Sequence, residues 1–233
     1  MKIAIIKPDY HIHGGFEVVM DRIITGLKQH GHSVEYIKYF EQQDVIDIGC
    51  GRGEFLELLA EKGIKAVGID IYKDFVDYCS DKGLNAVHTD ALSYLRSVPD
   101  NSLGGIFLGQ VIEHLEQDYL TELIELSYQK LRLGAHFVAE TPNPTNLTTF
   151  TNSFYLDLSH VKPIHPETMK FLLHYFGFKE ANIVFSEISK IQYSLPVLDG
   201  DDHIANLQGF NDGINLINNL LFGYQDYAII GKK

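Results

Sequence analysis

The chain of 233 residues has few cysteines, few basic residues and no long apolar run. Its two cysteines, Cys50 and Cys79, form no C-x-x-C pair, which excludes a disulfide framework and a thiolate zinc site. Because 19 Lys and Arg stand against 31 Asp and Glu, the net charge of −12 disfavours nucleic acids and anionic membrane surfaces as partners. No run reaches the length of a membrane span or a signal-peptide core, so we expect a cytoplasmic protein.

From residue 44 onward, short apolar runs alternate with amphipathic segments. The runs expected to form buried strands are 44–48, 65–70, 85–90, 104–110 and 135–141. Segments 54–63 and 117–131 have apolar residues at helical spacing. Gly63, Gly83 and Gly134 stand where we expect helices to end. This alternation predicts a mostly parallel sheet with helices on both faces.

After residue 141 the pattern changes. Residues 141–167, TPNPTNLTTFTNSFYLDLSHVKPIHPE, are polar and aromatic without a period, and such long loops are usually functional. A helix over 165–177 and a strand over 182–188 are expected next. We expect the Asn- and Gly-rich residues 191–223 to be irregular, and 225–233 to form a last strand.

The glycine-rich stretch DVIDIGCGRGEF, residues 44–55, predicts a tight turn that a ligand approaches closely. A phosphate-binding P-loop needs Lys and then Ser or Thr after the last glycine, whereas Glu54 and Phe55 follow Gly53, which excludes it. A dinucleotide fingerprint needs its third glycine at position 54, where Glu54 would also repel a pyrophosphate.

Acidic residues flank this turn. Asp47 precedes Gly49, and Asp70 follows Gly49 by 21 residues at the end of the next expected strand. An acid at that place accepts hydrogen bonds from ribose hydroxyls. A positively charged nucleoside without phosphate is compatible with such acids, and S-adenosylmethionine has a sulfonium, a ribose and no phosphate.

Four segments in order resemble the class I S-adenosylmethionine-dependent methyltransferases: DVIDIGCGRGEF, AVGID, HTDALSYL and LGQVIEHL. The resemblance covers residues 44–231 and implies an α/β, Rossmann-like fold with a mostly parallel seven-stranded sheet and an antiparallel C-terminal hairpin. It implies S-adenosyl-L-methionine as cofactor and S-adenosyl-L-homocysteine as product. The cofactor-binding residues that it implies are Asp47, Gly49, Cys50, Gly51, Gly53, Asp70, Ile71, Asp90, Ala91, Gly109 and Gln110.

For several of these residues a structural interpretation stands beside the functional one. In the family, Asp47 contacts the amino end of the ligand, although it could merely cap the turn. Asp70 could cap a helix, and Asp90, which in the family meets the adenine amino group, could equally be an N-cap. Cys50 is expected to be a packed residue and not a nucleophile.

The long loop suggests the methyl acceptor. FYLDLSHVKPIHPETMKFLL resembles a segment of methyltransferases associated with bacterial polysaccharide assembly, in which Asp-Pro-Thr-His is common. Here the pattern is Asp157-Leu158-Ser159-His160, which keeps the Asp and the His. A hydroxyl acceptor must lose a proton, and histidine titrates near neutrality. We expect His160 as the base and Asp157 as the residue that orients or charges it, and the alternative is that His160 only pins the loop.

Three further residues complete this prediction. His114 is a second catalytic candidate, Tyr155 is expected to shape the acceptor pocket, and His165 is expected to start a helix. Glu113 and His114 with Gln110 are similar to the Glu-x-x-Glu-His of quinone-precursor O-methyltransferases, some of which bind a divalent ion. Because Gln110 is a poorer ligand for a hard cation than Glu, we expect no metal and only a helix start at the cofactor's edge.

The N-terminal residues add a second resemblance. Residues 1–37 are similar to the opening of GT-B glycosyltransferases, with a strand, a Gly14-Gly15 turn and a helix. We therefore expect an N-terminal βα(β) extension over residues 1–43, whose second strand ends at residue 37, and a methyltransferase domain over 44–233.

Together these features predict an O-methyltransferase for a sugar hydroxyl in surface-glycan or nucleotide-sugar metabolism, with a small-molecule or glycan acceptor. The alternatives are a methyltransferase of phenols or quinone precursors, or a non-catalytic module that partners a glycosyltransferase. A glycosyltransferase or a second copy of the chain is the expected protein partner.

Overall fold

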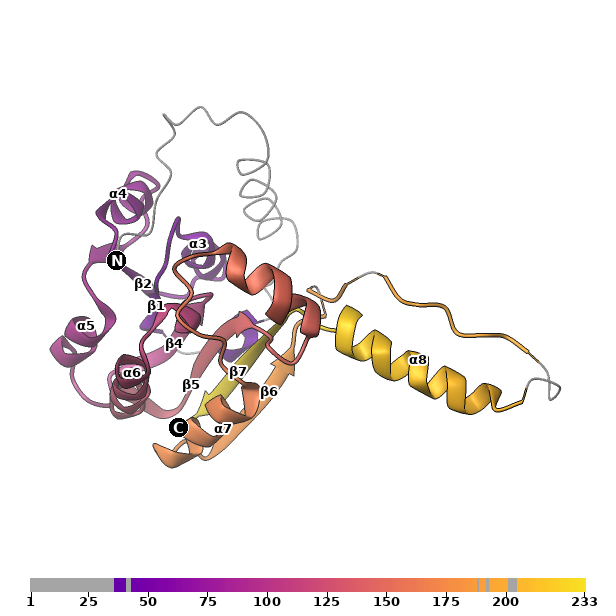
Figure 1. The fold of residues 1–233 in the computed structure, drawn as a ribbon. Helices are drawn as coiled ribbons and strands as arrows, with labels where there is room; N and C mark the ends of the chain where they lie inside the picture. The colour runs from indigo at the N-terminus through magenta and orange to yellow at the C-terminus, as the bar shows by residue number, and fades with distance from the viewer. Residues whose placement is uncertain (1–35, 41–42, 188, 192, 201–204) are drawn as a thin grey trace, which may run out of the picture.

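The computed structural model describes residues 36–40, 43–187, 189–191, 193–200 and 205–233. They form a seven-stranded sheet in the order β3-β2-β1-β4-β5-β7-β6, in which β7 is antiparallel to both of its neighbours (Figure 1). This is the fold that the strand and helix alternation predicts. Most of the expected N-terminal unit, and the glycosyltransferase resemblance with it, lies outside the described residues.

The predicted strands and helices are present, most of them within two residues of the expected ends. The strands are β1 (Val45–Ile48), β2 (Ala66–Asp70), β3 (Ala86–His88), β4 (Leu103–Gly109), β5 (Leu131–Pro142), β6 (Glu180–Phe185) and β7 (Asp226–Lys232). The helices are α3 (Glu54–Glu61), α4 (Lys73–Asp81), α5 (Ala91–Ser97), α6 (Gln117–Lys130), α7 (Pro166–Tyr175) and α8 (Leu207–Phe222), with short turns η1 (Ile37–Tyr39), η2 (Ile112–His114), η3 (Thr149–Ser153) and η4 (Phe154–Leu156). None of the described helices is long and apolar enough to cross a membrane.

Helices cover both faces of the sheet because the central strands are apolar on both sides. All four residues of β1 are buried. On one face α5, α6 and α7 contribute Leu95, Leu123 and Leu173 to a common core with β4. On the other face α3 contributes Phe55, whose ring lies 3.9 Å from that of Phe107 in β4, centroid to centroid.

The core includes residues that precede the predicted domain boundary at residue 43. Tyr36 and Phe40 are buried and pack with Phe55 and Phe107. Residues 36–39 are helical, whereas a strand was expected to run to residue 37, so that prediction is wrong at its end. The exact domain boundary stays a prediction, but the core that contains Phe55 and Phe107 already includes Tyr36.

Strand β5 begins earlier than expected. Gly134 was expected to end a helix, yet it lies inside β5, because Leu131 already pairs with Leu103. The pairing shifts register before His136, and Gly134 adopts a left-handed φ of 83° while its N–H donates to the carbonyl of Lys233. The glycine therefore marks an irregularity within the strand.

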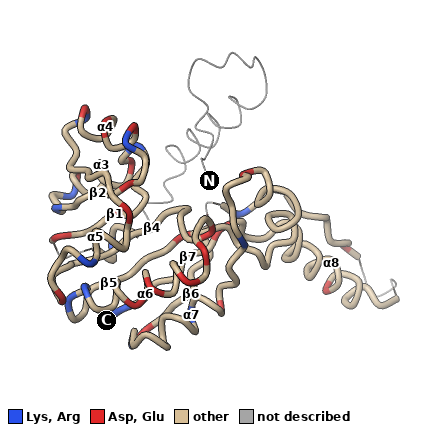
Figure 2. Tube along the Cα trace, turned by 60° about the vertical axis from the view of Figure 1, so that its left-hand side comes forward, with Lys and Arg blue, Asp and Glu red and all other residues tan. Residues whose placement is uncertain are grey.

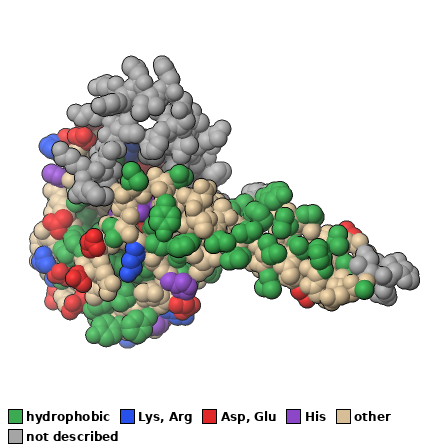
Figure 3. Space-filling view, viewed as in Figure 1, with side chains coloured by type: hydrophobic (Ala, Val, Ile, Leu, Met, Phe, Trp, Pro, Cys, Tyr) green, Lys and Arg blue, Asp and Glu red, His purple; other side chains and the backbone are tan. Residues whose placement is uncertain are grey.

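The expectation of irregular structure over 191–223 is wrong. Helix α8 occupies sixteen of these residues and extends away from the sheet as an arm (Figure 1). The arm is held to the extended segment 193–198, because Asn218 exchanges hydrogen bonds with the backbone of Leu195 and Asn211 does so with Leu198. Figure 3 shows apolar side chains along it, and Figure 2 shows few charges; Asp212 is the helix's single charged residue.

Phe40 offers a test of the N-terminal part of the core. Replacing Phe40 by Ala removes a fully buried ring and should lower the free energy of unfolding by about 3–5 kcal/mol, measured by urea denaturation. Lys38→Ala, at an exposed position two residues earlier, is the matched control and should change it by less than about 0.5 kcal/mol. Equal stabilities of the two variants would show that this segment is no part of the core.

Candidate active site

The glycine turn after β1 is fixed by the acid at the end of β2. The N–H of Gly51 donates to Oδ2 of Asp70 at 3.0 Å, and the N–H of Tyr72 donates to Oδ1 at 2.8 Å. Gly51 has a left-handed φ of 52°, and apart from Gly51 and its two chain neighbours no atom of the described residues lies within 4 Å of the place where a Cβ would stand. Asp70 is therefore not the cap of α4, whose N-cap is Tyr72; it holds the turn in a shape that leaves one side open.

Asp47, on β1, sits among carboxylates. Its side chain is buried, and burial, with Glu54 and Asp70 nearby, raises its pKa to about 8. Burial also raises the pKa of Asp70. A cation at this edge would favour the ionised form of both groups.

The other predicted cofactor residues lie around the same strand ends. Asp90 is the N-cap of α5: its Oδ1 accepts from the N–H of Ser93 at 3.0 Å, and that side-chain interaction lowers its pKa. Ile71 is 59% exposed, which is unusual for an isoleucine beside a core. Cys50 is buried against Gly68, and burial raises its thiol pKa, as expected of a packed residue.

Three more of these residues complete the edge. Ala91 is buried at the start of α5. Gly109 ends β4, and Gln110 follows with a left-handed φ of 56° and donates from its N–H to the carbonyl of Glu140. The geometry thus brings every predicted cofactor residue to the carboxyl ends of β1, β2, β3 and β4.

A second group of side chains lies where β4 ends. Glu113 is fully buried in η2 because it follows the core residue Ile112. Its Oε2 accepts from Oγ1 of Thr141 at 2.9 Å, whereas its Oε1 has no hydrogen-bond partner in the described part of the chain. Burial raises the pKa of this carboxyl to about 8.

The long loop is hydrogen-bonded to the backbone of Glu113. The carbonyl of Glu113 accepts from the N–H of Val161 at 2.9 Å. That contact brings Ser159 to His114, whose Nδ1 lies 2.9 Å from the Ser159 hydroxyl. The same hydroxyl donates to Oδ1 of Asp157 at 2.5 Å, so it can only accept from His114, and Nδ1 of His114 carries the proton.

His160 is held in the same way. Its Nδ1 lies 2.6 Å from the carbonyl of Phe154, which can only accept, so Nδ1 carries the proton and Nε2 has a free lone pair. The rings of His114 and His160 meet edge to face, with centroids 4.6 Å apart. Each Nε2 lies 3.9 Å from Oε1 of Glu113.

The three predicted catalytic residues are therefore neighbours, and the carboxylate of Asp157 hydrogen-bonds to Ser159 and through it to His114. The backbone carbonyl of Asp157 accepts from the N–H of His160 at 3.3 Å, and the orientation of the His160 ring by the Asp157 carboxylate stays a prediction. Burial lowers the pKa of His114, while hydrogen bonds from Ser159 hold the pKa of Asp157 below its usual value. Sequence reasoning missed Ser159, for which the Asp-x-Ser-His pattern is the only signal.

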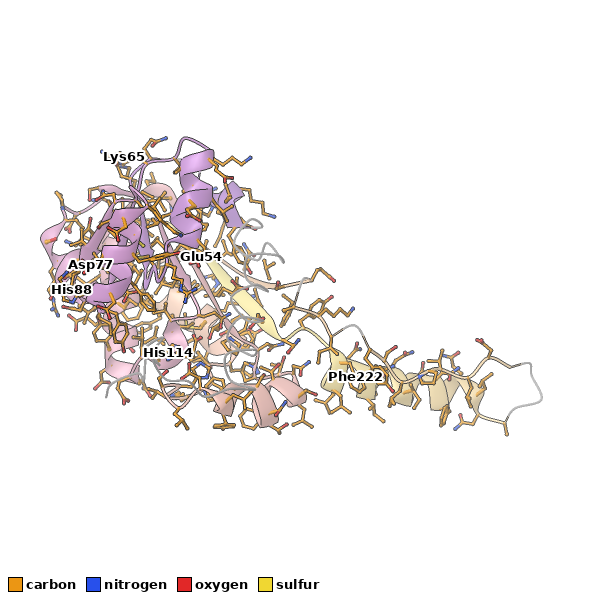
Figure 4. The ribbon with its side chains drawn as sticks, turned by 90° about the horizontal axis from the view of Figure 1, so that it is seen from above. Glu54, Lys65, Asp77, His88, His114 and Phe222 are labelled. Atoms are coloured by element: carbon orange, nitrogen blue, oxygen red, sulfur yellow. The ribbon has the colours of Figure 1, made fainter. Side chains whose placement is uncertain are left out.

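Two other loop residues have clear places. His165 is the N-cap of α7, and its Nδ1 accepts from the N–H of Glu167 at 3.2 Å, which confirms the expected helix start. Tyr155 is 58% exposed, and its ring packs on those of Phe150 and Phe154. Figure 4 labels His114 in the body of the domain, and Phe222 at the base of the arm.

Glu113, His114 and His160 are also the residues that could hold a metal ion. One ligand atom from each lies within 4.8 Å of the others. For the cofactor, the acid-flanked turn at Asp47, Gly51 and Asp70 offers the open backbone and the negative charge that a nucleoside cation needs.

The fold, the turn and the acids together define a class I S-adenosylmethionine-dependent methyltransferase. The sequence profile of the family described as methionine biosynthesis protein MetW matches residues 32–189, more than half of the chain, and the chain belongs to that family.

Solved and curated relatives agree with this class. A crystal structure of an S-adenosylmethionine-dependent methyltransferase from Archaeoglobus fulgidus is 40% identical, covers 94% of this chain and 100% of its own, and superposes with a TM-score of 0.85. A probable S-adenosylmethionine-dependent methyltransferase of Mycolicibacterium smegmatis is 24% identical over 181 residues, 74% of this chain and 69% of its own length. A possible histamine N-methyltransferase of Thermotoga maritima, 14% identical with a TM-score of 0.63 over 94% of this chain and 96% of its own, shares the fold.

The buried carboxyl of Asp47 yields a prediction for the cofactor-free protein. Since its folded pKa of about 8 exceeds the unfolded value of 3.8, the folded state binds more protons between these two pH values, and stability falls as pH rises through that window. Asp47→Asn removes this loss, so its stability relative to the parent should rise by about 1–3 kcal/mol from about pH 5 to pH 8 and then level off.

Chemical denaturation across this pH range measures the effect. Asp81→Asn, at an exposed position at the end of α4, is the control and should show no pH-dependent difference. A constant difference between parent and Asp47→Asn would contradict the raised pKa.

Proposed function

We propose that this methyltransferase transfers the cofactor's methyl group to a hydroxyl of a sugar, in surface-glycan or nucleotide-sugar metabolism. The observation that carries the proposal is the free lone pair on Nε2 of His160, which the hydrogen bond from Nδ1 to the Phe154 carbonyl leaves available. An acceptor that must lose a proton needs such a group, whereas a thioether or a neutral amine does not.

In this proposal the acids of the glycine turn bind the cofactor. Asp47 meets the amino end of S-adenosylmethionine, and Asp70 meets the ribose while it keeps its bonds to Gly51 and Tyr72. Asp90 reaches the adenine amino group with an oxygen not used for capping, and the exposed Ile71 packs on the base. The other predicted cofactor residues between Gly49 and Gln110 contribute backbone atoms to the proposed cofactor site.

The chemistry is an in-line displacement. The acceptor oxygen attacks the methyl carbon, the bond from that carbon to sulfur breaks, and S-adenosylhomocysteine leaves. The proton of the acceptor hydroxyl passes to Nε2 of His160. Asp157 acts at one remove: through Ser159 it fixes the tautomer and the orientation of His114, which packs against His160. Holding the two reactants in line is the main contribution of the protein.

The surroundings of His160 favour a sugar over a phenol. The ring of Phe154 packs on His160 with centroids 4.5 Å apart, and Tyr155 extends these aromatic surfaces toward solvent. Sugars combine an apolar C–H face, which packs on aromatic rings, with hydroxyls, which imidazole and carboxylate groups bind. A phenol would use the rings but leave the polar groups unpaired.

The location and the partners are proposals as well. We expect the enzyme to work in the cytoplasm, where nucleotide sugars are made, and to meet its glycan acceptor next to a glycosyltransferase or as a homodimer. Helix α8 of the arm has a single charged residue in a chain of net charge −12, so it suits contact with another protein.

An acceptor panel tests the proposed substrate class. Purified protein with methyl-labelled cofactor should label neutral sugar fragments or nucleotide sugars at least tenfold faster than phenols of similar size. Heat-treated protein and reactions without acceptor are the controls. Faster labelling of phenols would move the function to small aromatic acceptors, and labelling of neither class would contradict the proposal.

One replacement of His160 distinguishes a catalytic base from a residue that only holds the loop in place. Asn at this position can still donate to the Phe154 carbonyl but has no group in place of Nε2, so His160→Asn should lower kcat by about 10²–10⁴-fold with unchanged affinity for S-adenosylhomocysteine. His174→Asn, at an exposed position on α7, is the control. If His160→Asn keeps full activity, the residue only pins the loop.

A further inference from the structure

Three atoms that can each accept a proton or a metal face one another at the end of β4, and no donor stands between them. They are Oε1 of Glu113 and the Nε2 atoms of His114 and His160. Oε1 is buried and has no hydrogen-bond partner in the described residues. At 3.9 Å, each nitrogen is too far from it for a hydrogen bond.

Both histidine rings are oriented by a hydrogen bond at Nδ1. A hydroxyl that is itself bound to Asp157 accepts from Nδ1 of His114, and a backbone carbonyl accepts from Nδ1 of His160. This arrangement, in which the distal ring nitrogen donates to a fixed acceptor, directs the lone pair of the other nitrogen, as in protein metal sites. The second oxygen of Glu113 is fixed in turn by Thr141.

We infer that Glu113, His114 and His160 form a site for a divalent transition-metal ion. Two imidazole nitrogens and one carboxylate oxygen suit Zn²⁺, Fe²⁺, Co²⁺ or Mn²⁺, and they do not suit Ca²⁺ or Mg²⁺, which bind oxygen ligands. Bonds of about 2.0–2.2 Å place tetrahedral ligand atoms about 3.4 Å apart. The distances of 3.9 Å are thus wider than this by about half an ångström, which small side-chain rotations close.

Three protein ligands leave at least one position open, as catalytic metal sites do. An acceptor hydroxyl that binds there would lose its proton at lower pH. The inference deepens the proposed function and rests on it for the identity of the open-position ligand. With an ion bound, His160 would be a ligand and the metal would help a bound hydroxyl lose its proton to solvent; without the ion, the same lone pair of His160 is free to take that proton.

This inference differs from the expectation of no metal, which was based on Gln110 in place of a glutamate. The proposed third ligand is not residue 110 but His160, which is 50 residues further along the chain and lies at the site because of the loop.

Metal binding itself is the test, and its readout does not depend on turnover. Full-length protein without an affinity tag, stripped with a chelator and dialysed, is titrated with Co²⁺ and followed by visible absorption, and with Zn²⁺ by calorimetry. We expect one ion per chain at this site and a cobalt spectrum of a four- or five-coordinate site.

Four variants assign that ion to the cluster. Glu113→Gln, His114→Asn and His160→Asn should each weaken Co²⁺ binding at least tenfold, while Ser159→Ala, which removes only the support of His114, should weaken it about tenfold. His174→Asn and a double replacement of His11 and His13 by Ala are controls for binding by other histidines. Circular dichroism and affinity for S-adenosylhomocysteine verify that each variant is folded.

The outcomes separate this inference from the proposed function. If Co²⁺ binds and the ligand variants lose it while no sugar is labelled, the metal site stands and the proposed acceptor fails. If stripped protein labels sugars at full rate and binds no ion, or if Glu113→Gln binds Co²⁺ as tightly as the parent, the metal inference is overturned and the acceptor assignment is untouched.

Discussion

The site depends on a backbone contact at the carbonyl of Glu113, which accepts from the N–H of Val161 at 2.9 Å and from that of Lys162 at 3.4 Å. It joins a loop to the end of β4 across 48 residues of sequence. Without it, Ser159 and His160 would have no reason to lie near His114, because loops of this length are otherwise free to take many shapes. The carbonyl is available because η2 is a single tight turn, and its place is fixed by the buried Ile112.

The same strand ends concentrate buried carboxyl groups. Asp47, Asp70 and Glu113 are all largely removed from water, and burial raises the pKa of each. A protein that only needed stability would not keep such groups, because each ionised form is costly to bury. A bound cation would offset this cost: in our proposals, the ammonium of the cofactor beside Asp47 and a metal ion beside Glu113. Binding and ionisation are therefore linked at both ends of the site.

The sequence predicted the sheet, and the placing of Asp47 and Asp70 at one edge of it, because both follow local rules. Continuous apolar runs such as that in β1 mark buried parallel strands, and the acid at the end of β2 occupies its place by topology alone. Helix α8 was missed because its four Asn and two Gly have low helix propensity, although Leu207, Phe210, Ile214, Ile217 and Leu221 keep helical spacing.

The link between Asp157 and His114 could not be predicted, for a different reason. Along the chain, Asp157 is three residues from His160 and 43 from His114, so proximity in sequence favoured His160 and gave no sign of the link to His114. The direction of the Ser159 hydroxyl decides the question, and it follows from an Asx-type turn in which the N–H and the hydroxyl of Ser159 both donate to one carboxylate oxygen. Because that hydroxyl donates its proton to Asp157, it must accept the proton of Nδ1 of His114. That hydrogen bond determines which ring nitrogen of His114 faces Glu113. The chemistry available at the site is thus determined by a turn two side chains away from it.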